Sequence, residues 1–151
     1  MPIQNDINLL DPRMQKCIRR LIELVPARMQ GYQLYVNETL RQLSVQMAYR
    51  ARGTAPAWLV KEYFKACGLW QITDAECAVQ NTKTMESKHL QGLAADVYLI
   101  RGKKILWTAA PEEWAKLFAI AEDECGLDAC AGGKFNAWKW DMPHMEFRAE
   151  I

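Results

Sequence analysis

The chain has 151 residues, of which half are hydrophobic and a quarter are charged. This length suits one compact domain with its own core and is short for two. Nineteen basic and eighteen acidic residues give a net charge of +1. That balance argues against a nucleic-acid-binding protein, because such proteins usually carry a large basic excess. We therefore expect one domain over residues 1–151, with an N-terminal helical segment over 1–29 and the remainder over 30–151.

The five cysteines are odd in number, irregularly spaced and contain no CxxC pair. This pattern indicates free buried thiols rather than a disulfide framework. Cys125 and Cys130 are close enough in sequence to be considered as metal ligands, but packing in the core is the simpler interpretation. The N-terminus lacks a basic stretch followed by an apolar run, and no run is long enough to span a bilayer. We therefore expect no secretory signal and no membrane insertion.

Helical and strand patterns alternate irregularly along the chain. Asp11 followed by Pro12 is a typical helix start, and apolar residues recur at helical spacing up to Val25. The further predicted elements are a strand over 32–37, helices over 43–52 and 56–67, strands over 94–100 and 104–108, a helix from 111 that ends before 126, and a strand over 145–149. The absence of a repeating βαβ order favours an α+β fold.

The chain has only two histidines, His89 and His144. Two imidazoles and a carboxylate are a common ligand set for catalytic zinc, and Asp96 lies seven positions after His89. On one straight strand, residues at this spacing would face opposite ways. Gly92 lies between them and permits a tight turn, so both side chains could reach one ion.

Asp141 and His144 are three positions apart, which would suit a helix. Pro143 argues against a helix because it pushes the preceding residue toward extended geometry. A kinked strand or a bulge could instead present both side chains on one side. Residue types alone leave a zinc site open, because a lone histidine is more often packed or exposed than bound to a metal.

Two motifs together resemble a known family. SxHxxGxAxD followed by DxPHxE is similar to the zinc D-alanyl-D-alanine carboxypeptidases and L-alanyl-D-glutamate endopeptidases, which include phage endolysins. The matching residues are Ser87, His89, Gly92, Ala94 and Asp96 in the first motif, and Asp141, Pro143, His144 and Glu146 in the second. The resemblance implies one zinc ion held by His89, Asp96 and His144. It also implies a small α+β domain with an antiparallel sheet that carries the zinc site, as in Hedgehog-type and D,D-peptidase-like proteins.

The resemblance extends upstream to Arg41 and Gln46, which match a family arginine followed five residues later by glutamine. It implies that Arg41 stabilises the oxyanion of the tetrahedral intermediate and that Asp141 is the general base. A carboxylate that orients His144 is the alternative for Asp141. The segment 56–69 departs from the family, because many relatives have a short loop there.

The remaining site residues have alternatives that the sequence leaves open. We expect Ser87, Gln46 and Trp140 to contact substrate, although Ser87 could instead shape its turn and Trp140 could be a core residue. Glu146 could orient a ligand or pair with a surface cation.

The expected function is a zinc peptidase that cuts peptidoglycan stem peptides, in the form of an endolysin-like L-alanyl-D-glutamate endopeptidase. The alternatives are a D-alanyl-D-alanine carboxypeptidase or dipeptidase, a non-catalytic zinc-binding domain of the same fold, and a structural protein without metal. We expect a monomer that is made in the cytoplasm without a signal peptide and acts on the cell wall after its release in phage lysis or by an unknown export route.

Overall fold

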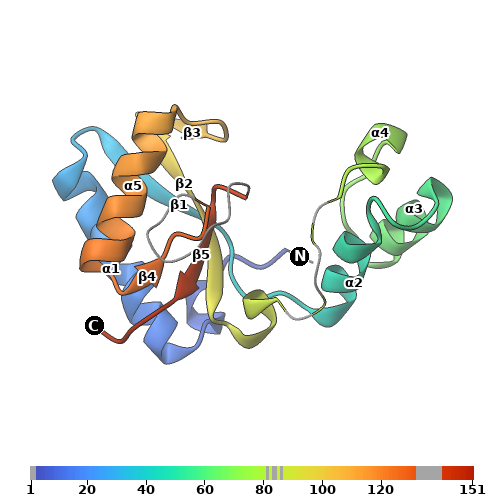
Figure 1. The fold of residues 1–151 in the computed structure, drawn as a ribbon, viewed down its shortest axis with the longest axis horizontal. Helices are drawn as coiled ribbons and strands as arrows, with labels where there is room; N and C mark the ends of the chain where they lie inside the picture. The colour runs from blue at the N-terminus through green and yellow to red at the C-terminus, as the bar shows by residue number, and fades with distance from the viewer. Residues whose placement is uncertain (1–2, 81, 83–84, 86, 132–140) are drawn as a thin grey trace.

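The computed structural model describes residues 3–80, 82, 85, 87–131 and 141–151. Its elements in chain order are η1 (Ile7–Leu9), α1 (Pro12–Arg28), β1 (Tyr32–Glu38), α2 (Leu43–Ala51), α3 (Ala57–Ala66), α4 (Asp74–Cys77), η2 (Lys88–Gln91), β2 (Ala94–Arg101), β3 (Lys104–Leu106), α5 (Pro111–Glu124), β4 (Leu127–Asp128) and β5 (His144–Phe147) (Figure 1). Among these described helices, none has both the length and the apolar character needed to cross a bilayer.

An antiparallel sheet forms the centre of the larger part of the molecule, which we call the α/β body. Its strand order is β1-β2-β5-β4, and β3 pairs with the second half of β2. Ala95, Val97 and Leu99 on β2 are fully buried in one core with side chains of α1 and α5. Because successive side chains of a strand point to opposite faces, Asp96 and Tyr98 lie on the other face of the sheet.

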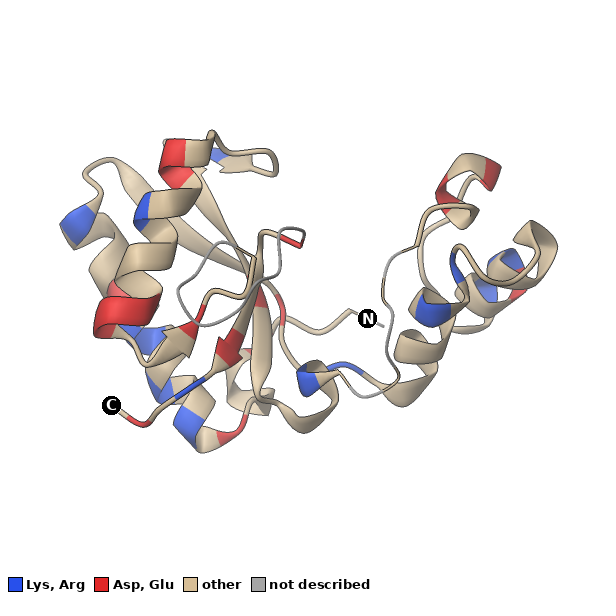
Figure 2. Cartoon of the chain, viewed as in Figure 1, with Lys and Arg blue, Asp and Glu red and all other residues tan. Residues whose placement is uncertain are grey.

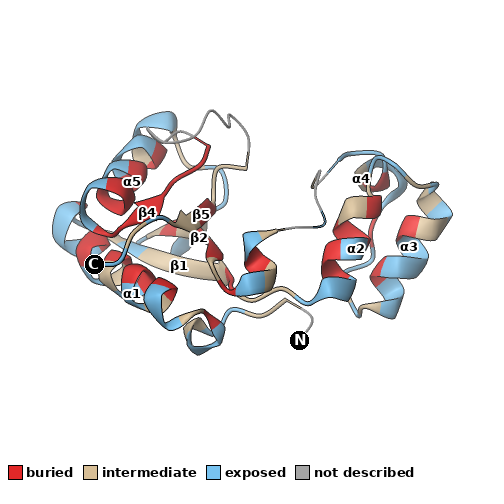
Figure 3. Ribbon diagram, turned by 60° about the horizontal axis from the view of Figure 1, so that its bottom comes forward, coloured by how far each residue is buried: buried red, intermediate tan, exposed pale blue. Residues whose placement is uncertain are grey.

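The helices α2, α3 and α4 form a separate helical lobe beside this body (Figure 1). The lobe has its own small core, which includes Val45, Tyr49, Val60 and Phe64. Figure 3 shows buried residues in both the body and the lobe, so each part packs its own apolar side chains. Lys and Arg segments are interspersed with Asp and Glu over both parts (Figure 2).

The register of the sheet brings three polar side chains into one row. Asp96 on β2 is paired with His144 on β5 and with Glu38 on β1. The pairing of β1 with β2 shifts between Val36 and Glu38, so Asn37 is the extra residue of a β-bulge. Directly paired residues share a face of the sheet, and the bulge therefore places Glu38 on the same face as Asp96 and His144.

Most of the predicted elements are confirmed. The helix that begins at Pro12 does so with Asp11 accepting a hydrogen bond from Arg13 N, and helices form at 43–51 and 57–66. The predicted return strand over 104–108 was too long, since β3 ends at Leu106, and the last strand begins at His144 rather than at 145 and ends at Phe147. The short elements β4 and α4 were not predicted.

Candidate metal centre

His89 lies in a short 3-10 turn that the sequence specifies closely. Ser87 caps this turn, and its Oγ accepts a hydrogen bond from His89 N at 3.2 Å. Gly92 ends the turn with a φ of 70°, in the left-handed region that favours glycine. A Cβ at Gly92 would lie 2.8 Å from Asp11 N, so the start of α1 leaves no room for a side chain there. The spacing from His89 to Asp96 therefore depends on a glycine at this position.

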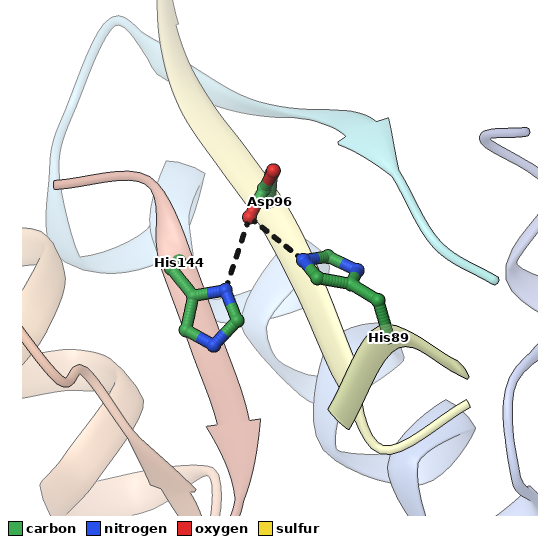
Figure 4. Close-up of side chains that lie close together, drawn as sticks. All are labelled: His89, Asp96 and His144. Carbon is green, nitrogen blue, oxygen red and sulfur yellow. Dashed lines mark hydrogen bonds and ion pairs between the residues drawn. The ribbon is translucent and has the colours of Figure 1, made fainter. Parts of the chain in front are cut away.

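The side chains of His89, Asp96 and His144 converge on one point (Figure 4). Asp96 Oδ1 lies 3.1 Å from His89 Nε2 and 3.4 Å from His144 Nδ1. Ligand atoms of a tetrahedral zinc ion lie about 3.3–3.5 Å apart, given metal–ligand distances of about 2.0–2.1 Å. All three side chains are largely buried, with exposed fractions of 1%, 14% and 6% for His89, Asp96 and His144. The donor types, spacing and burial fit a single zinc ion.

Both imidazoles are held so that each presents a lone pair to this point. His89 Nδ1 lies 2.9 Å from the carbonyl oxygen of Thr39, which can only accept, so Nδ1 carries the proton and Nε2 is left for a metal. His144 Nε2 lies 3.0 Å from Glu146 Oε1, so its Nδ1 faces Asp96. Hydrogen bonds of this kind to the second ring nitrogen are typical of metal-binding histidines.

Burial and the close contacts among these side chains shift the pKa values of Asp96 and His144. Burial by itself would raise the pKa of Asp96, but the two imidazoles outweigh it and hold that pKa below its usual range. Burial likewise lowers the pKa of His144, but hydrogen bonds to Asp96 and Glu146 dominate and raise it to about 10. Without a metal, His144 is therefore protonated at neutral pH. A bound cation would take the place of that proton.

Asp141 lies beside the three side chains without joining them. Its backbone has a φ of 60°, and its carbonyl accepts a hydrogen bond from His144 N, which closes a tight turn before β5. The turn brings Asp141 Oδ2 to 3.9 Å from His144 Nδ1. Burial and the charge of Asp96 raise the pKa of Asp141 to about 6. A carboxylate at this place and with this pKa can exchange a proton near neutral pH.

Arg41 lies near Oδ2 of Asp96, whereas the two imidazoles lie near Oδ1, and three neighbours hold its guanidinium. Its Nε and Nη2 donate to both oxygens of Glu38 at 2.7 and 2.9 Å, and its Nη1 donates to Gln46 Oε1 at 2.7 Å. The guanidinium also lies 4.9 Å from the centre of the Tyr49 ring and 4.0 Å from Asp96 Oδ2. Within the part of the chain that the structure describes, these three hydrogen bonds use three of the five guanidinium N–H groups.

Glu38 is the residue of this centre that the sequence analysis missed. It is 5% exposed and forms a bidentate ion pair with Arg41, at three positions' distance in the chain. Its place depends on the bulge at Asn37, which leaves no motif in the sequence. The spacing of a glutamate three residues before a candidate arginine was the one available signal.

The structure brings most of the other predicted site residues to this centre. Gln46 is buried behind Arg41, and Ser87 shapes the turn of His89. Contact of these two residues with substrate stays a prediction, and Trp140 lies outside the described residues. Of the two alternatives for Glu146, the structure favours the orientation of a ligand, because this carboxylate binds the ring of His144.

Cys130 is also closer to the centre than expected for a simple core residue. It is fully buried, and its thiol, His144 and Glu146 offer donor atoms within 4.8 Å of one another. Burial and the nearby carboxylates raise the pKa of this thiol, so it stays protonated at neutral pH. The Cys130 thiol thus packs beside the pair formed by His144 and Glu146.

Comparisons with known proteins agree with this fold. No protein-family model and no curated protein matches the chain. Among solved structures, the L-Ala D-Glu endopeptidase ChiX of Serratia marcescens is similar over 97% of this chain and 86% of its own, with a TM-score of 0.57 and 18% identity.

Two further solved structures are similar at the same low identity. A variant of the vancomycin resistance D,D-pentapeptidase VanY in complex with Zn(II) matches with a TM-score of 0.53 and 17% identity, over 93% of this chain and 73% of its own. The LD-carboxypeptidase LdcB matches with a TM-score of 0.51 and 17% identity, over 97% of this chain and 70% of its own. The predicted α+β fold is thus confirmed, and the chain shares the fold of peptidases that act on peptidoglycan.

Proposed function

We propose that this protein is a zinc peptidase that hydrolyses peptidoglycan stem peptides. The observation that carries the proposal is the convergence of His89 Nε2, Asp96 Oδ1 and His144 Nδ1, with the Asp141 carboxylate beside them. Three protein ligands leave one position of a tetrahedral zinc ion open, as catalytic sites require. A purely structural zinc site would be closed by a fourth protein ligand.

The roles of the chain's own residues follow from their places. When bound, zinc acidifies water and polarises the substrate carbonyl. Asp141, with a pKa of about 6, accepts a proton from the attacking water and returns it to the leaving amine. The Arg41 guanidinium, which lies 4.0 Å from Asp96 Oδ2, stabilises the developing oxyanion. Glu146 and the Thr39 carbonyl hold the two imidazoles in their metal-binding tautomers.

The finer proposal is an endolysin-like L-alanyl-D-glutamate endopeptidase. The DxPHxE form of the second motif supports it, and ChiX is an L-Ala D-Glu endopeptidase with a similar fold. A D-alanyl-D-alanine carboxypeptidase is the second candidate, and the likeness to VanY, a structure of which contains D-alanine-D-alanine, favours it. We further propose that the protein acts as a monomer, with one zinc ion, on cell wall that it reaches after its release from the cytoplasm in phage lysis.

Digestion of purified muropeptides with and without a chelator tests these versions together. Mass analysis should find cleavage between L-alanine and D-glutamate, and the chelator should abolish it. Release of free D-alanine from pentapeptide would support the carboxypeptidase instead. A zinc-loaded protein that cuts neither substrate would reject the enzyme in favour of a non-catalytic zinc-binding domain.

A further inference from the structure

A cavity of about 410 Å³ lies on the α/β body and is lined in part by residues that adjoin the metal ligands in the chain. Tyr98, Trp107 and Trp114 form its aromatic wall, and Met142 and Pro143 form the side toward the metal. The Tyr98 ring lies edge-on to Trp107 at 4.8 Å and to Trp114 at 6.0 Å, so the three rings support one another. The volume is within the range of small-ligand pockets, which is about 300–1,000 Å³.

The cavity and the metal centre share two chain segments. Met142 and Pro143 lie between the proposed base Asp141 and the ligand His144. Tyr98 is two residues beyond Asp96 on β2, on the same face of the sheet, which places the two Cα atoms about 7 Å apart. A substrate bound at the metal therefore has this cavity within reach of its neighbouring groups.

The chemistry of the wall selects an uncharged, ring-shaped group. None of the described residues that line the cavity is Asp, Glu, Lys or Arg, and the Trp107 side chain is 53% exposed. The D-glutamate carboxylate and the charged third residue of a stem peptide would lose their hydration there without an ionic partner. A sugar ring instead offers C–H groups to an aromatic face and keeps its hydroxyls toward water and Thr108.

Among the parts of peptidoglycan, the muramyl sugar meets this description. It is uncharged once its lactyl carboxyl group is joined to the first L-alanine. In an L-alanyl-D-glutamate endopeptidase only the lactyl group and that alanine separate the sugar ring from the cut bond, a span of about 7 Å if the lactyl group counts as one residue length. In a D-alanyl-D-alanine carboxypeptidase, the lactyl group and four residues, or about 17 Å of extended chain, would intervene.

We propose that the aromatic cavity is a glycan subsite that takes the N-acetylmuramyl ring of the substrate. This inference rests on the proposed peptidase function and on its endopeptidase form. It makes the enzyme specific for stem peptides that are still attached to the glycan. The sugar would position the L-alanyl-D-glutamate bond at the metal.

The test compares two substrates, a disaccharide–peptide and the same stem peptide without sugar. The zinc-loaded wild type should cleave the first with the higher kcat/KM. In Trp107→Ala the ratio of the two kcat/KM values should fall about tenfold, because a single aromatic contact supplies roughly this factor. Trp58→Ala is the matched control, since Trp58 is an exposed tryptophan of the helical lobe and should leave the ratio unchanged.

A binding measurement guards against a variant that fails to fold. In wild-type protein, the N-acetylglucosaminyl-N-acetylmuramyl disaccharide with its lactyl carboxyl group converted to an amide should shift the indole N–H signal of Trp107 in an NMR titration and leave that of Trp58 in place. An unchanged kcat/KM ratio in Trp107→Ala, or no shift at Trp107, would overturn the subsite while cleavage of the muropeptide still upheld the peptidase. Failure of wild-type protein to cut either substrate would instead count against the proposed function.

Discussion

Zinc binding should be coupled to the release of one proton from His144. In the metal-free protein the pKa of His144 is raised to about 10, so its ring is charged throughout the range from pH 7 to pH 9. A metal at Nδ1 displaces that proton, while Nε2 keeps its hydrogen bond to Glu146. Asp96 contributes no proton in this range, because its pKa lies below the usual value.

The expected magnitude follows from this count. One displaced proton tightens the apparent zinc Kd about tenfold, or about 1.4 kcal/mol, for each pH unit. Between pH 7 and pH 9 the Kd should therefore fall at least about 100-fold, because ionisation of zinc-bound water adds to the proton displaced from His144. The free energy of unfolding of the metal-free protein should decrease over the same rise in pH, while zinc binding becomes tighter. A raised pKa stabilises the fold fully below the unfolded value of about 6.5, and this contribution is lost as the pH rises toward 10.

Competition with a chromophoric chelator at several pH values measures this dependence, after correction for zinc hydrolysis. Calorimetry in buffers of different ionisation enthalpy should report at least one proton released per zinc at pH 8. In Glu146→Gln the loss of one carboxylate should lower the pKa of His144 and flatten the dependence at its alkaline end. A zinc Kd that stays constant from pH 7 to pH 9 would refute the coupling.

Three further predictions concern single residues. Asp141→Asn should lower kcat by about 10²–10⁴-fold and leave the zinc stoichiometry at one. In the wild type, kcat should fall as the pH drops below about 6, where Asp141 becomes protonated. Full activity of Asp141→Asn would contradict the role of Asp141 as the base. Glu38→Gln should cost about 3 kcal/mol in urea denaturation, because it breaks a buried ion pair with Arg41, whereas the exposed pair partner Glu23→Gln should cost little. Cys130→Ala should still bind one zinc ion by elemental analysis, and loss of the metal would make this thiol a ligand.

The sequence predicted the parts of the site that depend on local chain geometry. The turn of His89 could be anticipated because Ser87 and Gly92 have the residue types that cap and end such a turn. Asp96 could then be placed at the start of a strand. Two distant stretches of chain could be paired only through the family resemblance, since spacing alone says nothing of which strands become neighbours.

Other features depend on tertiary structure that the sequence does not encode locally. A two-residue strand such as β4 has no periodicity to detect, and it forms because β5 offers an open edge. Strict alternation along β1 would place Glu38 on the same face of the sheet as Val36. The bulge at Asn37 instead places it on the face of Asp96. The helix α4 is different, because its Thr73–Glu76 capping box was visible in the sequence and could have predicted it.

The contact between Arg41 and Tyr49 ties the metal centre to a segment far from it. The Tyr49 ring packs on Arg41 at one side, at 4.9 Å, and on Phe64 and Trp70 at the other, at 6.1 and 6.2 Å. The guanidinium thus rests on a cluster of aromatic rings that includes Phe64 of α3. A substitution that truncates Phe64 would leave a cavity beside Tyr49, so the Tyr49 ring could tilt and Arg41 could change position. Mutagenesis surveys of this protein would then record activity losses at residues that never meet a substrate.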